Sequence, residues 1–141
     1  MGSEERINPL NGEKVIIAPQ RADRPYAFIK ARSSLSPDNC PFCPGHESET
    51  TPETLAYRSL GSIKDDPNWW VRFFMNKYPA VTYERSGLQS NHLYQRSDAI
   101  GVHELGITRK HGADFGEPGF DDEHNLTYEL LWAIHERKNG N

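Results

Sequence analysis

The chain has few cysteines, few apolar residues and no long apolar run. Only two of its 141 residues are cysteines, Cys40 and Cys43, which excludes a framework of several disulfides. The apolar share is 35%, the mean hydropathy is −0.78, and no run approaches the roughly 20 residues that a membrane-spanning helix needs. The N-terminus, Met-Gly-Ser-Glu-Glu-Arg, has no apolar signal-peptide core. From these absences we expect a cytoplasmic protein without a membrane partner.

An excess of positive charge is also absent. The formal net charge is −4, whereas electrostatic binding to nucleic acid requires a clustered basic surface. We therefore expect no nucleic-acid partner. Free nucleotides stay open as ligands, because one or two well-placed arginines can hold a diphosphate whatever the net charge.

The sequence does contain a series of short strand patterns. Asn8 to Gly12 is typical of a turn, and Lys14 to Ala18 is a short β-branched strand. Trp69 to Phe74 gives the strongest strand pattern, and Gly101 to Thr108 alternates as another. The polar stretch from Glu84 to Asp98 predicts an exposed loop.

A helix is predicted at the end of the chain, over about residues 121–138, capped by an aspartate at its start. Leu126, Leu130 and Ile134 fall on one face of that helix. Thr51 to Thr54 could start either a short helix or a strand. Short strands followed by one helix favour the α+β class with an antiparallel sheet.

Cys40-Pro-Phe-Cys43 is the sharpest local signal. Two thiolates at this spacing can reach one metal ion from a single turn. Zinc normally takes four ligands, so histidines would supply the others, and the available pool is His46, His92, His103, His111, His124 and His135. Two other interpretations stay open: reduced structural thiols, and a thioredoxin-like redox pair. The redox pair is disfavoured because it does not open a helix after a buried strand.

Two polar segments could contact a nucleotide. Arg21 and Arg24 lie between prolines after a strand, where their guanidinium groups could hold a phosphate. Two solvated loop charges would explain them more simply. Asn76 could hydrogen-bond a ribose or base and Lys77 could meet a phosphate, although a strand-ending turn is an equally simple interpretation.

The aromatic residues and histidines near the strands have plain structural interpretations. The aromatic residues of 69–74 alternate within one strand, so we expect their side chains to lie in the core rather than to stack on a ligand. His103, Leu105 and Ile107 are spaced by two residues and so fall on the same face of the strand. This pattern predicts that His103 is a hydrogen-bonded histidine in the core. His111 follows that strand beside a glycine, where its ring could reach a metal.

Four ordered blocks of the sequence carry more information together than any one of them. They are Asn8-Pro-Leu-Asn-Gly with residues 15–25, Cys40-Pro-Phe-Cys-Pro-Gly-His-Glu with Thr51-Pro-Glu, Trp70-Val-Arg with Asn76-Lys-Tyr-Pro-Ala-Val, and Gly101-Val-His-Glu-Leu. Taken in order, the blocks resemble the galactose-1-phosphate uridylyltransferase family. They cover nearly the whole chain but less than half of that family's usual length.

The resemblance implies a histidine-triad-like α+β fold, in which an antiparallel sheet forms a partial half-barrel and a helix follows at the C-terminus. It also implies a ping-pong transfer. In that reaction a histidine attacks the α-phosphate of UDP-glucose, and a hexose 1-phosphate then takes the uridylyl group. Zinc is the implied cofactor.

Two sets of residues in this chain match functional positions of the family. The first set would hold zinc: Cys40, Cys43 and His111. The second set would line the nucleotide pocket: Arg21, Arg24, Asn76 and Lys77.

The family's nucleophile lies in a His-Pro-His or similar motif, and these 141 residues contain none. We therefore expect residues 1–141 to be the N-terminal portion of such a domain, truncated after the helix and inactive by itself. We expect its zinc site to be weak, and exposed apolar surface to favour a homodimer. A non-catalytic zinc-binding module of the same fold and an adenylyl-transferring relative are the alternatives.

Overall fold

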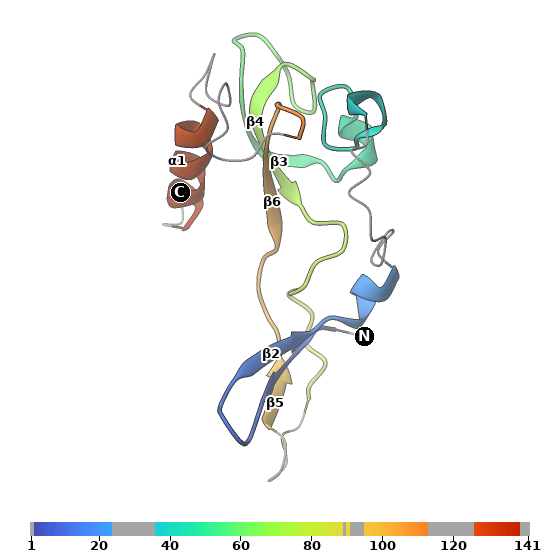
Figure 1. Cartoon of the computed structure of the whole chain (residues 1–141), viewed down its shortest axis with the longest axis vertical. Helices are drawn as coiled ribbons and strands as arrows, with labels where there is room; N and C mark the ends of the chain where they lie inside the picture. The colour runs from blue at the N-terminus through green and yellow to red at the C-terminus, as the bar shows by residue number, and fades with distance from the viewer. Residues whose placement is uncertain (1, 24–35, 89, 91–94, 113–125, 139–141) are drawn as a thin grey trace. The chain divides into compact units, whose positions relative to one another are not determined.

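The computed structural model describes residues 2–23, 36–88, 90, 95–112 and 126–138 (Figure 1). The chain forms two compact units, and each is described by itself. The first contains residues 1–31 and 76–104, and the second contains residues 32–75 and 105–141. Among the described residues, no helix has both the length and the apolar character needed to cross a membrane.

The first unit is built on a three-stranded antiparallel sheet. Its strands, in sheet order, are β2 (Lys14–Ile17), β1 (Glu4–Ile7) and β5 (Gln95–Asp98). Arg6 lies opposite Val15 on one side and Arg96 on the other. In the described part of this unit only Ser3 and Ala99 are buried. Main-chain pairing and side-chain hydrogen bonds therefore hold this unit more than an apolar core does.

The predicted turn between β1 and β2 is confirmed. The backbone N–H of Gly12 donates to the carbonyl of Asn8 at 2.9 Å, and Gly12 has a φ of +74°, a conformation that glycine adopts without steric cost. The N–H of Leu10 donates to Asn8 Oδ1 at 2.9 Å. Strand β2 ends one residue before the predicted Ala18, and a 3-10 helix, η1 (Pro19–Asp23), follows.

The prediction of an exposed loop over residues 84–98 is wrong for residues 95–98. Its last four residues form β5, which pairs with β1 over its whole length. All four side chains are polar, so no apolar alternation marks the strand in the sequence. The pairing is set by the free edge of β1, which only the tertiary structure brings to this segment.

The second unit holds a second three-stranded sheet and the α-helix. The strands in sheet order are β3 (Glu53–Arg58), β4 (Trp69–Met75) and β6 (Glu104–Thr108). The helices are η2 (Pro37–Asn39), η3 (Glu47–Glu49) and α1 (Leu126–Lys138). The α+β class, the antiparallel sheets and the C-terminal helix are thus confirmed, with the strands divided between two sheets. The segment that begins at Thr51 leads into strand β3 and not into a helix. Strand β6 starts at Glu104, three residues after the predicted Gly101.

The core of this unit lies between β4 and α1. Val71 and Phe73 of β4 pack with Leu130 and Ala133 of α1, and Figure 1 shows α1 beside the sheet. Trp69 and Phe74 are also buried. Since strand β4 is buried along most of its length, its aromatic residues form core, as predicted.

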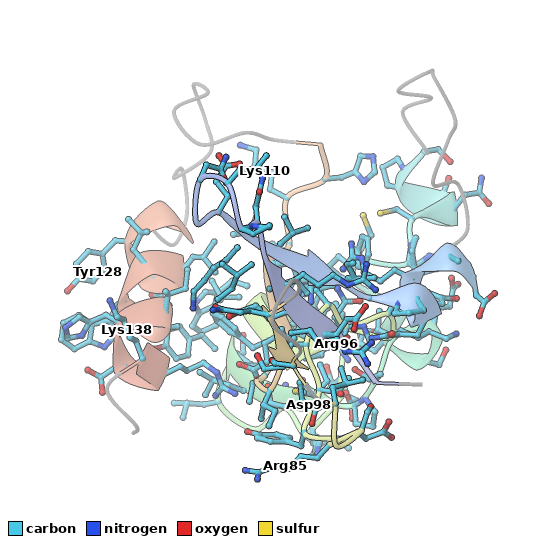
Figure 2. All side chains as sticks on the ribbon, turned by 90° about the horizontal axis from the view of Figure 1, so that it is seen from below. Arg85, Arg96, Asp98, Lys110, Tyr128 and Lys138 are labelled. Carbon is cyan, nitrogen blue, oxygen red and sulfur yellow. The ribbon has the colours of Figure 1, made fainter. Side chains whose placement is uncertain are left out.

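The buried face of α1 differs from the predicted one. Ile134 is 47% exposed, whereas Ala133 is 0% exposed and Leu130 is 5% exposed. Leu130, Ala133 and Arg137 are spaced by three and then four residues, so they share the face of the helix that meets the sheet. The Arg137 guanidinium lies over the Phe73 ring at 5.6 Å. On the outer side, Figure 2 shows Tyr128 pointing away from the helix, and it is exposed. The predicted start of the helix, residues 121–125, lies outside the described residues.

A network of charged side chains lies on β3 and β4. Arg72 is 1% exposed, and its Nη2 donates to Asp65 Oδ1 at 2.9 Å while its Nη1 donates to Thr50 Oγ1 at 2.8 Å. Its Nε lies 3.6 Å from Glu53 Oε2, and Arg58 pairs with the same carboxylate. Two cations and two anions therefore balance one another inside this unit.

Replacing Gly106 with alanine is expected to destabilise the second unit by about 1–3 kcal/mol. A Cβ at Gly106 would lie 2.6 Å from Phe73 Cε1 and 3.1 Å from Leu130 Cδ1. Urea unfolding followed by tryptophan fluorescence would measure the loss. Leucine lacks the ring atoms that cause the clash, so Gly106→Ala combined with Phe73→Leu should lose less than the sum of the two single changes. Additive losses would contradict the steric explanation.

Candidate metal centre and nucleotide-binding turn

Residues 40–45, here named the knuckle, bring two thiols into one turn. Helix η2 ends at Asn39 with Cys40 as its C-cap, and the N–H of Cys43 donates to the Cys40 carbonyl at 3.2 Å. Gly45 follows with a φ of +97°, which lets the chain reverse. Cys40 is 8% exposed and Cys43 is 7% exposed. The local sequence alone therefore places both sulfurs on one side of a tight turn.

His111 reaches the knuckle from the end of β6. The N–H of Arg109 donates to the Trp70 carbonyl at 3.0 Å, which continues the sheet pairing just past the strand. Gly112, with a φ of +66°, then turns the chain. His111 Nδ1 lies 3.1 Å from Cys43 Sγ. The ligand atoms of Cys40, Cys43 and His111 all lie within 4.8 Å of one another, so this group could hold a metal ion.

The described residues add no fourth side chain to this metal-binding group. His46 lies close in sequence, but its Nδ1 pairs with Glu49 Oε1 at 2.9 Å. His135 stacks on Trp132 in α1 with ring centroids 5.8 Å apart. His92 and His124 lie outside the described residues. Two sulfurs and one imidazole nitrogen form a donor set that zinc prefers, and the site fits that ion.

Burial affects the acidity of one of these thiols. The pKa of Cys43 is raised from 9.0 to about 11, first by burial, then by the hydrogen bond with Cys40 and by the charges of Cys40 and Asp38. The metal-free thiol is therefore protonated at neutral pH. Since the thiolate is the metal ligand, metal binding must release that proton.

Glu47 is a buried carboxylate that fixes the knuckle to strand β4. Its Oε1 accepts the indole N–H of Trp69 at 2.6 Å, and its Oε2 accepts the N–H of Gly45 at 3.0 Å. The residue is only 9% exposed. Nothing in the sequence marked this residue, because a glutamate four residues after a cysteine gives no signal of burial.

Glu47→Ala is expected to lower the free energy of unfolding by about 1–3 kcal/mol, since the buried indole N–H of Trp69 and the N–H of Gly45 would both lose their acceptor. Thermal unfolding followed by circular dichroism would measure the change. Glu49→Ala is the matched control, because Glu49 lies two residues away with a side chain that is 54% exposed. Equal losses in the two variants would show that the buried hydrogen bonds are not the cause.

The predicted substrate-binding residues that the structure describes lie in the first unit. Arg21 is part of η1, and its Nη1 donates to the carbonyl of Tyr78 at 3.2 Å. The interpretation of Arg21 as a fully solvated loop charge is therefore wrong, because it is half-buried and joined to the segment that contains Asn76 and Lys77. Arg24 lies outside the described residues.

Residues 76–80, here named the Asn76 turn, follow the end of β4. Asn76 Oδ1 accepts the N–H of Tyr78 at 2.9 Å, and the Asn76 N–H donates to the His103 carbonyl at 2.8 Å. Lys77 is exposed. His103 is hydrogen-bonded, as predicted, but half-buried rather than part of an apolar core. The structure thus joins Arg21, Asn76 and Lys77 in one local arrangement, and their binding of a nucleotide stays a prediction.

The chain is similar in sequence to one known enzyme and in fold to two solved structures. The chain is 40% identical over 84 residues to ADP-glucose phosphorylase of Arabidopsis thaliana, an alignment that covers 56% of this chain and 22% of that protein. A uridylyltransferase structure superposes on 96% of this chain with a TM-score of 0.55 and 21% identity, and a mutant uridylyltransferase does so with a TM-score of 0.57 and 24% identity. No family model matches the chain.

The chain corresponds to only part of each of these proteins. The chain spans 34% and 33% of the two uridylyltransferase chains, and 22% of the phosphorylase. At these identities the two structures establish a shared fold. The phosphorylase adds a sequence relation over the part of the chain that it aligns.

Proposed function

We propose that this chain, which is related over part of its length to the galactose-1-phosphate uridylyltransferase family, supplies the metal site and nucleotide-binding segments of a nucleotidyltransferase. Its substrates would be a nucleoside diphosphate sugar and a sugar phosphate. The observation that carries the proposal is the meeting of Cys40, Cys43 and His111, with ligand atoms within 4.8 Å although His111 comes from a distant segment. The 40% identity to ADP-glucose phosphorylase supports the same class of chemistry.

Zinc is the metal that we propose for this site. Bound zinc would act there as a structural cross-link between the knuckle and the segment after β6. Cys40 and Cys43 would bind as thiolates and His111 through its imidazole. With three ligands from the described residues, we expect weaker binding than at a four-ligand structural site.

The nucleotide would lie against the Asn76 turn. The amide of Asn76 can hydrogen-bond a ribose or a base, and the exposed ammonium group of Lys77 can pair with a phosphate. Arg21 supports the turn through the Tyr78 carbonyl and could keep other guanidinium N–H groups for a phosphate. The motif blocks predict UDP-glucose, whereas the identity to an ADP-glucose phosphorylase favours ADP-glucose.

The residues of this chain would bind substrate without performing the covalent step. The 141 residues hold no His-Pro-His motif, so we propose no nucleophile among them and expect no transferase activity from this chain alone. The same observation favours a second candidate, a non-catalytic zinc-binding module of the same fold. We also expect a cytoplasmic location and a tendency to dimerise.

Native mass spectrometry of the purified chain with zinc, ADP-glucose and UDP-glucose would test the proposal. We expect one zinc ion per chain and a non-covalent complex with one of the two sugar nucleotides. His111→Ala should lose the zinc, while His46→Ala, which changes a histidine outside the metal-binding group, should keep it. Zinc without any nucleotide complex would favour the non-catalytic module. A covalent nucleotidyl adduct would contradict the absence of a nucleophile.

A further inference from the structure

The connection between β1 and β2, residues 8–13 and here named the hairpin tip, contains an Asn-Gly pair. Residues 9–13 are exposed, so water reaches both Asn11 and Gly12. Gly12 has no Cβ, which leaves its backbone nitrogen open to approach by the side chain of Asn11. The hairpin tip therefore has the sequence of a chemically labile site.

The reaction open to this pair is deamidation through a cyclic imide. The backbone nitrogen of Gly12 attacks Cγ of Asn11, a new C–N bond closes the ring, and the bond between Cγ and Nδ2 breaks. Nδ2 leaves as ammonia with the proton that the Gly12 nitrogen loses. Water then opens one of the two ring carbonyls and leaves aspartate or isoaspartate in place of Asn11. Water is the only co-reactant.

Three hydrogen bonds oppose the first step in the folded hairpin. The Gly12 N–H donates to the Asn8 carbonyl at 2.9 Å, so the nitrogen that must attack is already engaged. Asn11 Oδ1 accepts the backbone N–H of Glu13 at 3.1 Å. Asn11 Nδ2 donates to Glu13 Oε2 at 2.8 Å. The side-chain amide is thus held at both of its polar atoms, and the hairpin tip must open before the ring can close.

We propose that Asn11 is a site of spontaneous deamidation and that Glu13 protects it by holding its side-chain amide in the folded hairpin. The inference is independent of the proposed nucleotide binding, because it concerns the hairpin tip alone. The product would weaken the hairpin. An aspartate carboxylate has no N–H to donate to Glu13 and adds a second negative charge beside it. An isoaspartate lengthens the main chain between Asn8 and Glu13, whose backbone hydrogen bond at 2.8 Å closes the hairpin.

Two substitutions of Glu13 test the protecting contact. Glu13→Ala keeps the backbone N–H that Asn11 Oδ1 accepts but removes the acceptor of Nδ2. Glu13→Gln is the matched control, because its side-chain oxygen can still accept that N–H. Glu13 is exposed, so neither change removes a buried side chain and the hairpin should still form.

Tryptic peptide mapping by mass spectrometry would follow the reaction in the full chain. Trypsin releases residues 7–14, which contain two asparagines. Asn8 cannot form the imide because Pro9 has no backbone N–H, so deamidation in this peptide belongs to Asn11. For each protein, the rate in buffer is divided by the rate in urea that unfolds the chain. This ratio measures the protection by the fold, and comparing it between variants removes effects of urea and of sequence alone.

The folded rate in the unchanged chain is expected to lie at least about tenfold below the unfolded rate, because opening the hairpin tip breaks several hydrogen bonds. Glu13→Ala should react roughly 3- to 10-fold faster than the unchanged chain when folded, since it loses one of these bonds. Glu13→Gln should stay within about twofold of the unchanged chain. All three proteins should react at the same rate when unfolded.

Several results would overturn the inference. Equal rates in the folded and unfolded chain would mean that the hairpin tip does not protect Asn11. A folded Glu13→Ala that reacts no faster than the unchanged chain, or no faster than Glu13→Gln, would mean that the bond from Nδ2 is not the protecting contact. No reaction at Asn11 even in the unfolded chain would contradict the assignment of the site itself.

Discussion

Serine in place of Cys43 is expected to lower the zinc affinity of this chain by a factor on the order of 10² to 10³. Structural zinc sites with four ligands contribute about 10–16 kcal/mol in total, so each ligand of such a site accounts for roughly 2.5–4 kcal/mol. Cys43 Sγ lies 3.1 Å from His111 Nδ1, and the substitution would remove one of the three sulfur and nitrogen atoms of the group. Competition titration against a chromophoric zinc chelator would measure the change.

The controls for this prediction come from the same chain. His111→Ala should cause a loss of the same order, because it removes another member of the group. His46→Ala should leave the affinity within about twofold, since surface changes of this kind shift free energies by less than ~0.5 kcal/mol. If Cys43→Ser binds zinc as tightly as the unchanged chain, the metal lies elsewhere and the proposed site is wrong. An equal loss in His46→Ala would add that residue to the ligands.

Methionine in place of Arg72 is expected to lower the free energy of unfolding of the second unit by about 3–5 kcal/mol, because the buried Glu53 carboxylate would keep only Arg58 as a cationic partner among the described residues and Asp65 would lose its ion pair. Arg72 is 1% exposed and contacts Asp65, Glu53 and Thr50. Its guanidinium also lies over the Phe74 ring at 4.9 Å. Such a loss is a large part of the roughly 5–15 kcal/mol that typically separates folded from unfolded states.

Urea unfolding followed by the fluorescence of the tryptophans in the same unit would measure this loss. Lys64→Met is the matched control, since it removes a positive charge beside Asp65 from an exposed side chain. That change should cost less than about 0.5 kcal/mol. A loss in Arg72→Met no larger than in Lys64→Met would mean that the buried network does not stabilise the unit.

The network of charged side chains around Arg72 also predicts how the stability of the second unit depends on pH. Burial alone would raise the pKa of the Asp65 carboxyl, but the N–H of Glu53, the hydrogen bond and charge of Arg72 and the charge of Lys64 together lower it below its usual 3.8. A lowered folded-state pKa contributes stability above the unfolded value, and that stability is lost as the pH falls through the folded value. Stability should therefore fall below about pH 3.8, and it should fall less steeply in Arg72→Met. Unfolding measured over this pH range, in both proteins, would check the slope.

Several features followed from the sequence because local chemistry determines them. The Asn-Gly turn needs a left-handed residue, which Gly12 supplies. The spacing of Cys40 and Cys43 places two sulfurs in one turn whatever the rest of the chain does. The aromatic β-branched pattern of residues 69–74 predicted the central strand, because such side chains favour a buried extended chain.

The features that depended on distant partners could not be read from local pattern. Strand β5 is polar and forms only because the edge of β1 is available to it. Ile134 has the right period for the buried face, yet the packing of α1 against β4 buries Ala133 in its place. Arg21 could be taken for a solvated charge because its partner, the Tyr78 carbonyl, lies 57 positions away.

The sequence by itself determined the chemistry that this protein carries: two thiols in a knuckle, a set of histidines, and polar residues in two loops. Tertiary structure decided which of these groups act together. It brought His111 to Cys43 across 68 positions, and it set His103 against the Asn76 turn. The physical reason is that residue type and short spacing decide what a side chain can bind, whereas strand pairing and packing decide which side chains share a site.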